Sequence, residues 1–202
     1  MKWQIPRGFS VGELRYPVPE RLTIAGLMNY VYEKDYAILT RLKVPANASG
    51  IVPIRAKARW LACTDKVCVP ESGSFALDLP VGTGTPNRAR FDEWRRALPR
   101  PLASTANFEI DGNRLKLGIP LPENVKVEEP YVFPVTGEVV DYAGKQSFSR
   151  SGDVLIAELP LKVDPPGRFS AVLALGDGRG LAFDAIPGDV PKSGSPIAAL
   201  GS

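Results

Sequence analysis

Short apolar stretches separated by prolines and glycines run along almost the whole chain. The 20 prolines and 19 glycines recur at the interval of roughly eight to twelve residues that is typical of small antiparallel strands. The stretches between them are rich in Val, Ile, Leu and Tyr, which favour extended backbone. The pattern therefore predicts an all-β protein.

Three stretches of the first half alternate between apolar and polar positions with a period of two, namely residues 36–44, 50–60 and 74–79. Successive side chains of a strand point to opposite faces of the sheet, so each stretch predicts a half-buried strand. In the second stretch the apolar face carries Ile54, Ala56, Ala58 and Trp60, and the polar face carries Arg55, Lys57 and Arg59. Trp60 is expected to belong to the core.

One helix is predicted, over residues 86–98, where Phe91, Trp94 and Leu98 recur at helical spacing. Thr85 is its candidate cap, and Pro99 ends it.

A second series of strands is predicted after this helix, at residues 106–110, 114–119, 131–135, 145–149, 154–161, 169–175 and 180–185. The sequences Asp111-Gly112-Asn113 and Asp177-Gly178-Arg179-Gly180 are typical of hairpin turns. We expect two immunoglobulin-like β-sandwiches joined by a short helical linker. The expected boundaries are 1–84 for the first β-sandwich, 85–104 for the linker, 105–188 for the second and 189–202 for a flexible tail.

The composition of the chain excludes several classes of function. Hydrophobic residues make up 44% of the chain and charged residues 23%, an ordinary balance for a folded globular protein. A net charge of +3, with Lys and Arg scattered, argues against nucleic acid as a partner. The chain has no histidine, which excludes a Ser/His/Asp triad, and its two cysteines alone cannot complete a zinc site, so no metal is expected.

The two cysteines, Cys63 and Cys68, lie close together in Trp60-Leu61-Ala62-Cys63-Thr64-Asp65-Lys66-Val67-Cys68-Val69-Pro70-Glu71. A strand is expected to end near Cys63 and another to begin near Cys68, with residues 64–67 forming the turn. The cysteines would then face each other across the strands, within reach of a disulfide. A disulfide over so short a loop stabilises a fold by only about 2 kcal/mol in the chain-entropy model. Two interpretations stay open here: a reversible redox pair, or a structural disulfide.

The segment from Trp60 to Glu71 resembles the N-terminal periplasmic domain of the DsbD and ScsB transmembrane thiol:disulfide reductases. Upstream features strengthen the resemblance to the ScsB-like branch: Trp3, Pro6, Gly8-Phe9, Gly12, Tyr16-Pro17-Val18-Pro19-Glu20-Arg21 and Gly26-Leu27-Met28-Asn29-Tyr30. The resemblance covers roughly the first 80 residues, and no motif extends it beyond Pro101.

This resemblance implies a relay domain in the periplasm that uses no cofactor. The full-length protein would also contain a membrane-embedded domain and a thioredoxin-like domain. The membrane-embedded domain would reduce the cysteine pair. The pair would then reduce soluble periplasmic thioredoxin-fold oxidoreductases by thiol-disulfide exchange. In the family pattern the later cysteine meets the partner, so Cys68 would be the attacking thiol and Cys63 the resolving one.

The resemblance also implies a cap loop that shields the sulfurs. Gly26, Leu27, Met28, Asn29 and Tyr30 occupy the matching stretch. Tyr30, Leu27 and Met28 are expected over the sulfurs and Gly26 at the hinge, although the Phe-Tyr pair of some relatives is absent. Leu27 and Met28 would alternatively be ordinary core residues.

Four residues are candidates for the environment of the thiols: Trp60, Asp65, Lys66 and Glu71. Lys66 would favour a thiolate and Asp65 would oppose it, so their effects partly cancel. Glu71 is a candidate proton acceptor for Cys68. The alternative interpretation of each of these charged residues is an ordinary exposed residue in contact with solvent.

The compartment does not follow from the N-terminus alone. Residues 1–6 lack the apolar core of a signal peptide, and no apolar run reaches the roughly 18 residues of a membrane span. A chain whose signal peptide has been removed would look the same, and the family resemblance favours the periplasm. The alternative function is an immunoglobulin-like binding module with a permanent disulfide, and a periplasmic chaperone is a third possibility.

Overall fold

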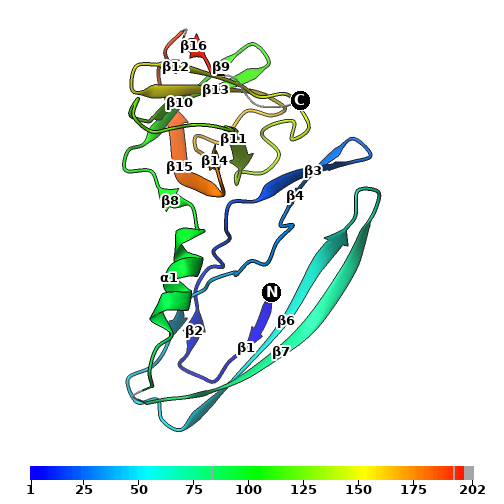
Figure 1. The fold of residues 1–202 in the computed structure, drawn as a ribbon, viewed down its shortest axis with the longest axis vertical. Helices are drawn as coiled ribbons and strands as arrows, with labels where there is room; N and C mark the ends of the chain where they lie inside the picture. Colours follow the sequence, from blue (N-terminus) through cyan, green and yellow to red (C-terminus); the bar gives the residue numbers. More distant parts are fainter. Residues whose placement is uncertain (83, 193, 198–202) are drawn as a thin grey trace. The chain divides into compact units, whose positions relative to one another are not determined.

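The chain folds into two compact units in a computed structural model that describes residues 1–82, 84–192 and 194–197 (Figure 1). The first unit consists of Met1–Tyr16 and Arg21–Arg96, and the second of Pro17–Glu20 together with the chain from Ala97 onward.

A long β-hairpin dominates the first unit. Strands β6 (Ile51–Cys63) and β7 (Cys68–Pro80) pair antiparallel over their whole length, and β1 (Lys2–Gln4) adds a short third strand beside β6. Two small two-stranded sheets accompany this sheet. They are formed by β2 (Ser10–Val11) with β5 (Leu42–Lys43), and by β3 (Glu20–Ile24) with β4 (Leu27–Val31).

The predicted alternation along β6 is confirmed only in its first part. Val52 and Ala56 are buried, Ile54 and Ala58 are half-buried, and Pro53, Lys57 and Arg59 are exposed. Beyond Ala58 the strand is mainly exposed on both faces. The far half of the hairpin is therefore a two-stranded ribbon that extends beyond the core of its unit.

The second unit is a single curled antiparallel sheet with two parallel contacts. Within the described residues its nine strands follow the order β11-β14-β15-β9-β10-β13-β12-β16, with β8 also paired to β15. The pairings of β15 with β9 and with β8 are parallel. The strands are β8 (Arg100–Pro101), β9 (Ala106–Asp111), β10 (Arg114–Pro120), β11 (Tyr131–Pro134), β12 (Ser147–Ser151), β13 (Val154–Pro160), β14 (Phe169–Gly176), β15 (Arg179–Pro187) and β16 (Ser195–Pro196).

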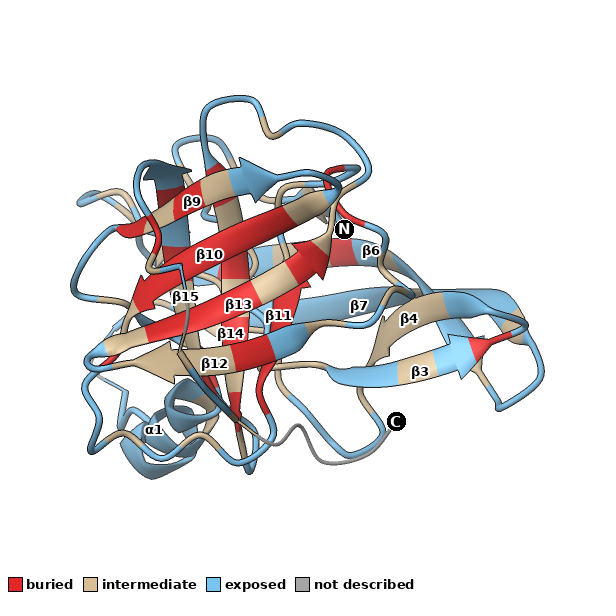
Figure 2. Ribbon diagram, turned by 90° about the horizontal axis from the view of Figure 1, so that it is seen from above, coloured by how far each residue is buried: buried red, intermediate tan, exposed pale blue. Residues whose placement is uncertain are grey.

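Most of the buried apolar side chains belong to this curled sheet, as the red segments of Figure 2 show. Its core includes Leu115, Leu117, Leu155, Phe169 and Leu173, all of them fully buried. The curl encloses these residues because a twisted sheet that bends on itself buries its concave face. In the described part of the first unit, by contrast, the buried apolar residues are Ile24, Val52 and Ala56.

The predicted helix is confirmed as α1 (Arg88–Arg96), and the expected cap is wrong. Asn87, and not Thr85, lies before the first turn, where its Oδ1 accepts a hydrogen bond from the Arg90 amide at 3.4 Å. An amide oxygen at this position satisfies a donor that the helix leaves unpaired. Phe91 and Trp94 contact each other edge to face, with ring centroids 5.1 Å apart.

The seven strands expected after the helix and the two hairpin turns are confirmed as β9–β15 within a residue or two. Gly112, Asp177 and Gly178 have positive φ angles of 58°, 52° and 68°, as tight hairpin turns require. The mostly β composition is also confirmed. The sheet topology, however, does not define two immunoglobulin-like sandwiches, because the second unit is one continuous sheet.

Two further expectations differ from the structure. The strand predicted at residues 36–44 is reduced to β5 and an isolated bridge between Leu39 and Arg15, because the segment pairs with residues 10–15 only at separate points. In the expected tail, Val190 is buried and β16 pairs with β12. Residues 193 and 198–202 of that tail lie outside the described residues.

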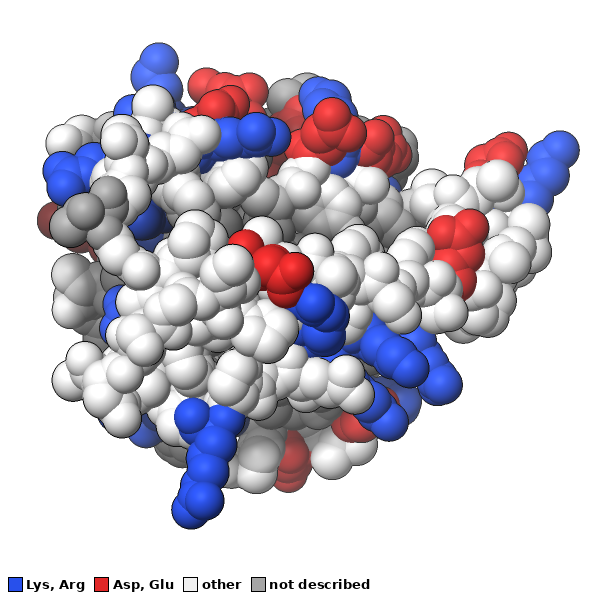
Figure 3. All heavy atoms as spheres, turned by 90° about the horizontal axis from the view of Figure 1, so that it is seen from below, with Lys and Arg blue, Asp and Glu red and all other residues white. Residues whose placement is uncertain are grey.

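Basic and acidic side chains are interspersed over the face drawn in Figure 3, as expected from the small net charge. Among the residues that the structure describes, no helix combines the length and the apolar character needed to cross a membrane.

Candidate functional site

The two cysteines form a disulfide at the tip of the β6–β7 hairpin. They are directly opposite each other in the strand register, with an S–S distance of 2.02 Å and a Cα–Cα distance of 4.0 Å. The adjacent pair Thr64–Val67 is joined by a backbone hydrogen bond of 2.8 Å from the Thr64 amide. Hydrogen-bonded and non-hydrogen-bonded pairs alternate along an antiparallel ladder, so the cysteines occupy a non-hydrogen-bonded pair, where opposite side chains lie closest.

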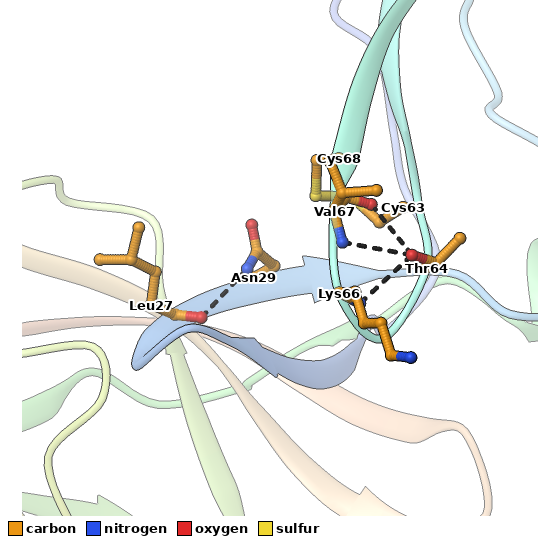
Figure 4. Close-up of a disulfide and its surroundings, with 7 residues drawn as sticks. All are labelled: Leu27, Asn29, Cys63, Thr64, Lys66, Val67 and Cys68. Atoms are coloured by element: carbon orange, nitrogen blue, oxygen red, sulfur yellow. Dashed lines mark hydrogen bonds between the residues drawn. A yellow bond between two sulfur atoms is a disulfide. The ribbon is translucent and has the colours of Figure 1, made fainter.

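The turn between the cysteines is organised by one hydroxyl group (Figure 4). Thr64 Oγ1 accepts hydrogen bonds from the amides of Lys66 and Val67, each at 3.2 Å. The predicted turn over residues 64–67 is therefore confirmed, and its side-chain closure is a threonine turn of the kind that tightens hairpin ends. Sequence reasoning did not single out Thr64, although a threonine directly after a strand is a recognised signal for such a turn.

The disulfide is accessible at the surface. Both cysteines are half-buried, the residues of the turn are exposed, and Val67 leaves 54% of its surface uncovered. A partner could therefore approach the sulfurs without unfolding the hairpin.

The strand register divides the side chains of the ribbon between two faces. Because directly opposite residues share a face and successive residues alternate, the disulfide lies on the same face as the pairs Leu61–Pro70, Arg59–Ser72 and Lys57–Ser74. We call this the disulfide face. The sequence pattern assigned Arg59 and Lys57 only to the polar face of the strand. Because each lies an even number of residues from Cys63, the sequence also indicates that they share a face with the cysteines.

Trp60 and Glu71 lie on the opposite face, where they are a register pair. Trp60 Nε1 donates a hydrogen bond of 2.9 Å to Glu71 Oε2. The indole ring lies over Gly73, whose added Cβ would approach it to 3.0 Å. Trp60 leaves 41% of its surface exposed. The expectation that Trp60 belongs to the core is therefore wrong, because the ribbon extends beyond the core at this point.

Asp65 and Lys66 lie in the turn, as expected, and both are exposed. The structure thus places Asp65 and Lys66 beside the cysteines. It places Glu71 on the other face of the ribbon, together with Trp60. Their effects on the thiols remain predictions.

The predicted cap-loop residues form the turn and second strand of the β3–β4 hairpin. Ala25 and Gly26 make its two-residue turn with positive φ angles of 49° and 81°, the conformation that hairpin turns of this length favour. Leu27 is 72% exposed, and Figure 4 shows its side chain well away from the sulfurs. Asn29 Nδ2 donates a hydrogen bond of 3.0 Å to the Leu27 carbonyl, and Met28, Asn29 and Tyr30 are half-buried. Their capping role stays a prediction.

A tyrosine cluster follows this hairpin. The rings of Tyr32 and Tyr36 stack with centroids 4.2 Å apart. Burial is the largest cause that raises the pKa of Tyr32 from its usual 10.0 to about 12, and the phenolates that would form at Tyr36 and Tyr16 contribute the rest of this rise. Tyr32 is therefore neutral throughout the physiological range.

Nothing in the described residues groups three or more His, Cys, Asp or Glu side chains into a metal site. The disulfide joins two strands that are already paired from Ile51 to Pro80, and it closes a loop with a sequence separation of only five. It therefore contributes little to holding the unit together, about 2 kcal/mol by chain entropy.

These features define a β-domain that presents an accessible disulfide at the tip of a long hairpin. Residues 1–80 match the family described as thiol:disulfide interchange protein DsbD, N-terminal. This region is therefore a domain of the DsbD N-terminal family, and residues 81–202 lie outside the match. No curated protein and no solved structure matches the chain.

Proposed function

We propose that the chain is a periplasmic thiol:disulfide exchange domain that relays electrons through Cys63 and Cys68. The observation that carries the proposal is the position of the disulfide at an exposed turn, where it adds little stability and two sulfurs are held in register. The family match over residues 1–80 supports the same chemistry. The ScsB-like branch is part of this proposal, on the strength of the upstream residues quoted above.

The exchange proceeds in two steps that balance in atoms and electrons. In the reduced domain the Cys68 thiolate attacks one sulfur of a partner disulfide, which forms a mixed disulfide and releases the partner's other sulfur as a thiolate. The Cys63 thiolate then attacks Cys68 Sγ, which forms the Cys63–Cys68 bond and releases the partner's second thiolate. Two electrons pass to the partner, and its thiolates take protons from water.

The domain must be reduced again after each cycle. A dithiol donor reverses the same two steps, and the membrane-embedded domain of the full-length protein is the proposed donor. The thioredoxin-like domain of that protein and soluble periplasmic thioredoxin-fold oxidoreductases are the proposed exchange partners. Because every step is a thiolate displacement, no cofactor is required.

Trapping of the mixed disulfide tests the function and the order of the cysteines. The reduced Cys63→Ser chain, mixed with an oxidised thioredoxin-fold protein, is expected to accumulate a covalent adduct through Cys68, seen as a mass shift that dithiothreitol reverses. The matched Cys68→Ser chain is expected to form much less. Absence of adduct from both variants, together with a wild-type disulfide that resists mild dithiols, would instead establish a structural disulfide in a binding module.

A further inference from the structure

The disulfide face carries a row of cations that leads toward the sulfurs. Arg59 and Lys57 project from β6 on this face, and Lys2 of β1 is the register partner of Lys57. Successive positions on one face of a strand are about 6.6 Å apart, so the row begins about 13 Å from the disulfide and reaches about 20 Å from it.

This positive charge is not neutralised within the described residues. Arg55, the next cation along the face, donates a 2.8 Å ion-paired hydrogen bond to Asp78. Asp78 is the one carboxylate that the register places on this face between Ile51 and Pro80. Lys2, Lys57 and Arg59 make no ion pair in the described structure, and all three are exposed. Three positive charges therefore remain available to a ligand.

The surface is also shaped to receive a partner. A groove of about 660 Å³ lies along Lys2, Gln4, Arg55, Lys57, Arg59 and Ser74. Between the groove and the sulfurs, Leu61 and Pro70 form an apolar step, in which Leu61 is 58% exposed. An apolar centre beside the reacting atoms with a charged rim is the composition of a protein interface.

We propose that the disulfide face of β6–β7 docks the exchange partner, and that this partner presents an acidic surface next to its reactive sulfur. The inference rests on the function proposed above and adds the chemistry of the partner. A macromolecular partner is favoured over a small disulfide because screening at physiological ionic strength has a length of about 8 Å. Charges about 13 to 20 Å from the sulfurs therefore act mainly on a molecule that covers the face as it reacts.

The opposite face carries no Lys or Arg between Ile51 and Pro80, so it has no matching row of cations. It carries Glu71 in place of the cations, and its exposed Phe75 and Leu77 are apolar. A partner attracted by charge is thus guided to the side of the ribbon on which the sulfurs lie.

Two extended peptide probes test the proposal with the full chain. Each carries a terminal cysteine as a mixed disulfide with thionitrobenzoate, and the remaining residues are mainly glutamate in one peptide and mainly lysine in the other. Release of thionitrobenzoate by the reduced chain is followed by absorbance. At low salt the acidic probe is expected to react about tenfold faster than the basic probe, and added salt is expected to reduce the difference.

Charge-reversal variants assign the effect to the face. Lys57→Glu with Arg59→Glu is expected to abolish or invert the preference for the acidic probe. Lys34→Glu with Lys43→Glu makes the same change in net charge away from β6 and β7, and is expected to retain the preference within about twofold. Should the first double variant fail to fold, Lys57→Gln with Arg59→Gln is expected to lower the preference without adding negative charge.

An uncharged disulfide separates the two hypotheses. If the reduced wild-type chain exchanges with hydroxyethyl disulfide but treats the acidic and basic probes alike, the docking inference is wrong and the proposed function stands. If it exchanges with neither hydroxyethyl disulfide nor the probes, the proposed function fails. Binding to phosphatidylglycerol vesicles that requires Lys57 and Arg59, without any preference between the probes, would assign the face to a membrane and overturn the inference.

Discussion

At the residue scale, the face on which each side chain near the disulfide lies depends on whether it is an even or an odd number of residues from the nearer cysteine. Cys63 and Arg59 share a face because they are four residues apart, whereas Trp60 is three residues from Cys63 and faces the other way. The sequence pattern could predict the strands and the turn. It could not predict that Trp60 would be exposed, because exposure depends on where the core of the unit ends.

The tyrosine cluster makes the first unit sensitive to alkaline pH. The folded-state pKa of Tyr32 lies near 12, above its usual 10.0, because burial disfavours the phenolate. The unfolded chain therefore loses this proton first as the pH rises. The stabilising contribution is complete below about pH 10 and is lost between about pH 10 and pH 12.

We expect Tyr32→Phe to remove this part of the pH dependence while it keeps the ring stacked on Tyr36. The measurement is urea unfolding of the wild-type and variant chains across that range. Tyr36→Phe is expected to keep most of the pH dependence, because it removes a smaller, electrostatic cause of the raised Tyr32 pKa and leaves the larger cause, burial. Equal pH dependence in the wild type and Tyr32→Phe would contradict the assignment.

At the element scale, the hairpin turn decides how close the two thiols remain after reduction. In the disulfide form the covalent bond holds the strand ends together. In the dithiol form this task falls to the strand pairing and to the two hydrogen bonds that Thr64 Oγ1 accepts. The turn hydroxyl should therefore favour disulfide formation by keeping Cys63 and Cys68 in register.

We expect Thr64→Ala to shift the equilibrium with glutathione toward the dithiol by up to about fivefold, the equivalent of about 1 kcal/mol for a lost hydrogen bond. Thr64→Ser retains the hydroxyl and should behave like the wild type. Ser74→Ala, which removes an exposed hydroxyl farther along the same ribbon, is a matched control. A wild-type equilibrium in Thr64→Ala would mean that strand pairing alone sets the spacing of the thiols.

At the scale of the whole molecule, burial is distributed unevenly. The curled sheet of the second unit contains most of the buried apolar side chains, whereas the β6–β7 ribbon is largely exposed (Figure 2). A region with few buried contacts opens at low free energy. The hairpin that carries the disulfide therefore belongs to the less protected part of the molecule.

Leu117→Ala tests whether the two units are stabilised separately. Leu117 is fully buried in the core of the curled sheet, so its truncation should destabilise that unit by about 2 to 5 kcal/mol. Hydrogen exchange followed by mass spectrometry is expected to accelerate in β9–β15 and to stay unchanged in β6 and β7. Leu77→Ala, at a position 55% exposed, is the control with a small expected effect. Faster exchange in both units would indicate one cooperative fold.

The sequence by itself determined the local features of this protein. Period-two alternation, punctuated by glycine and proline, was enough to predict most strands, and Gly112 and Gly178 marked hairpin turns because few other residues adopt positive φ at low cost. The cysteine pair and its turn could also be predicted, because the strand register and the turn hydrogen bonds join residues 63–68 to one another.

The tertiary structure alone decided the features that depend on distant residues. The parallel pairing of β9 with β15 brings together segments about 80 residues apart, and it joins the strands of the second unit into one curled sheet where a sandwich was expected. Tertiary packing also left the ribbon beyond the core, which exposed Trp60 and opened the basic face beside the disulfide. Local sequence patterns do not predict these features, because burial and strand order depend on packing between segments that are distant in the sequence.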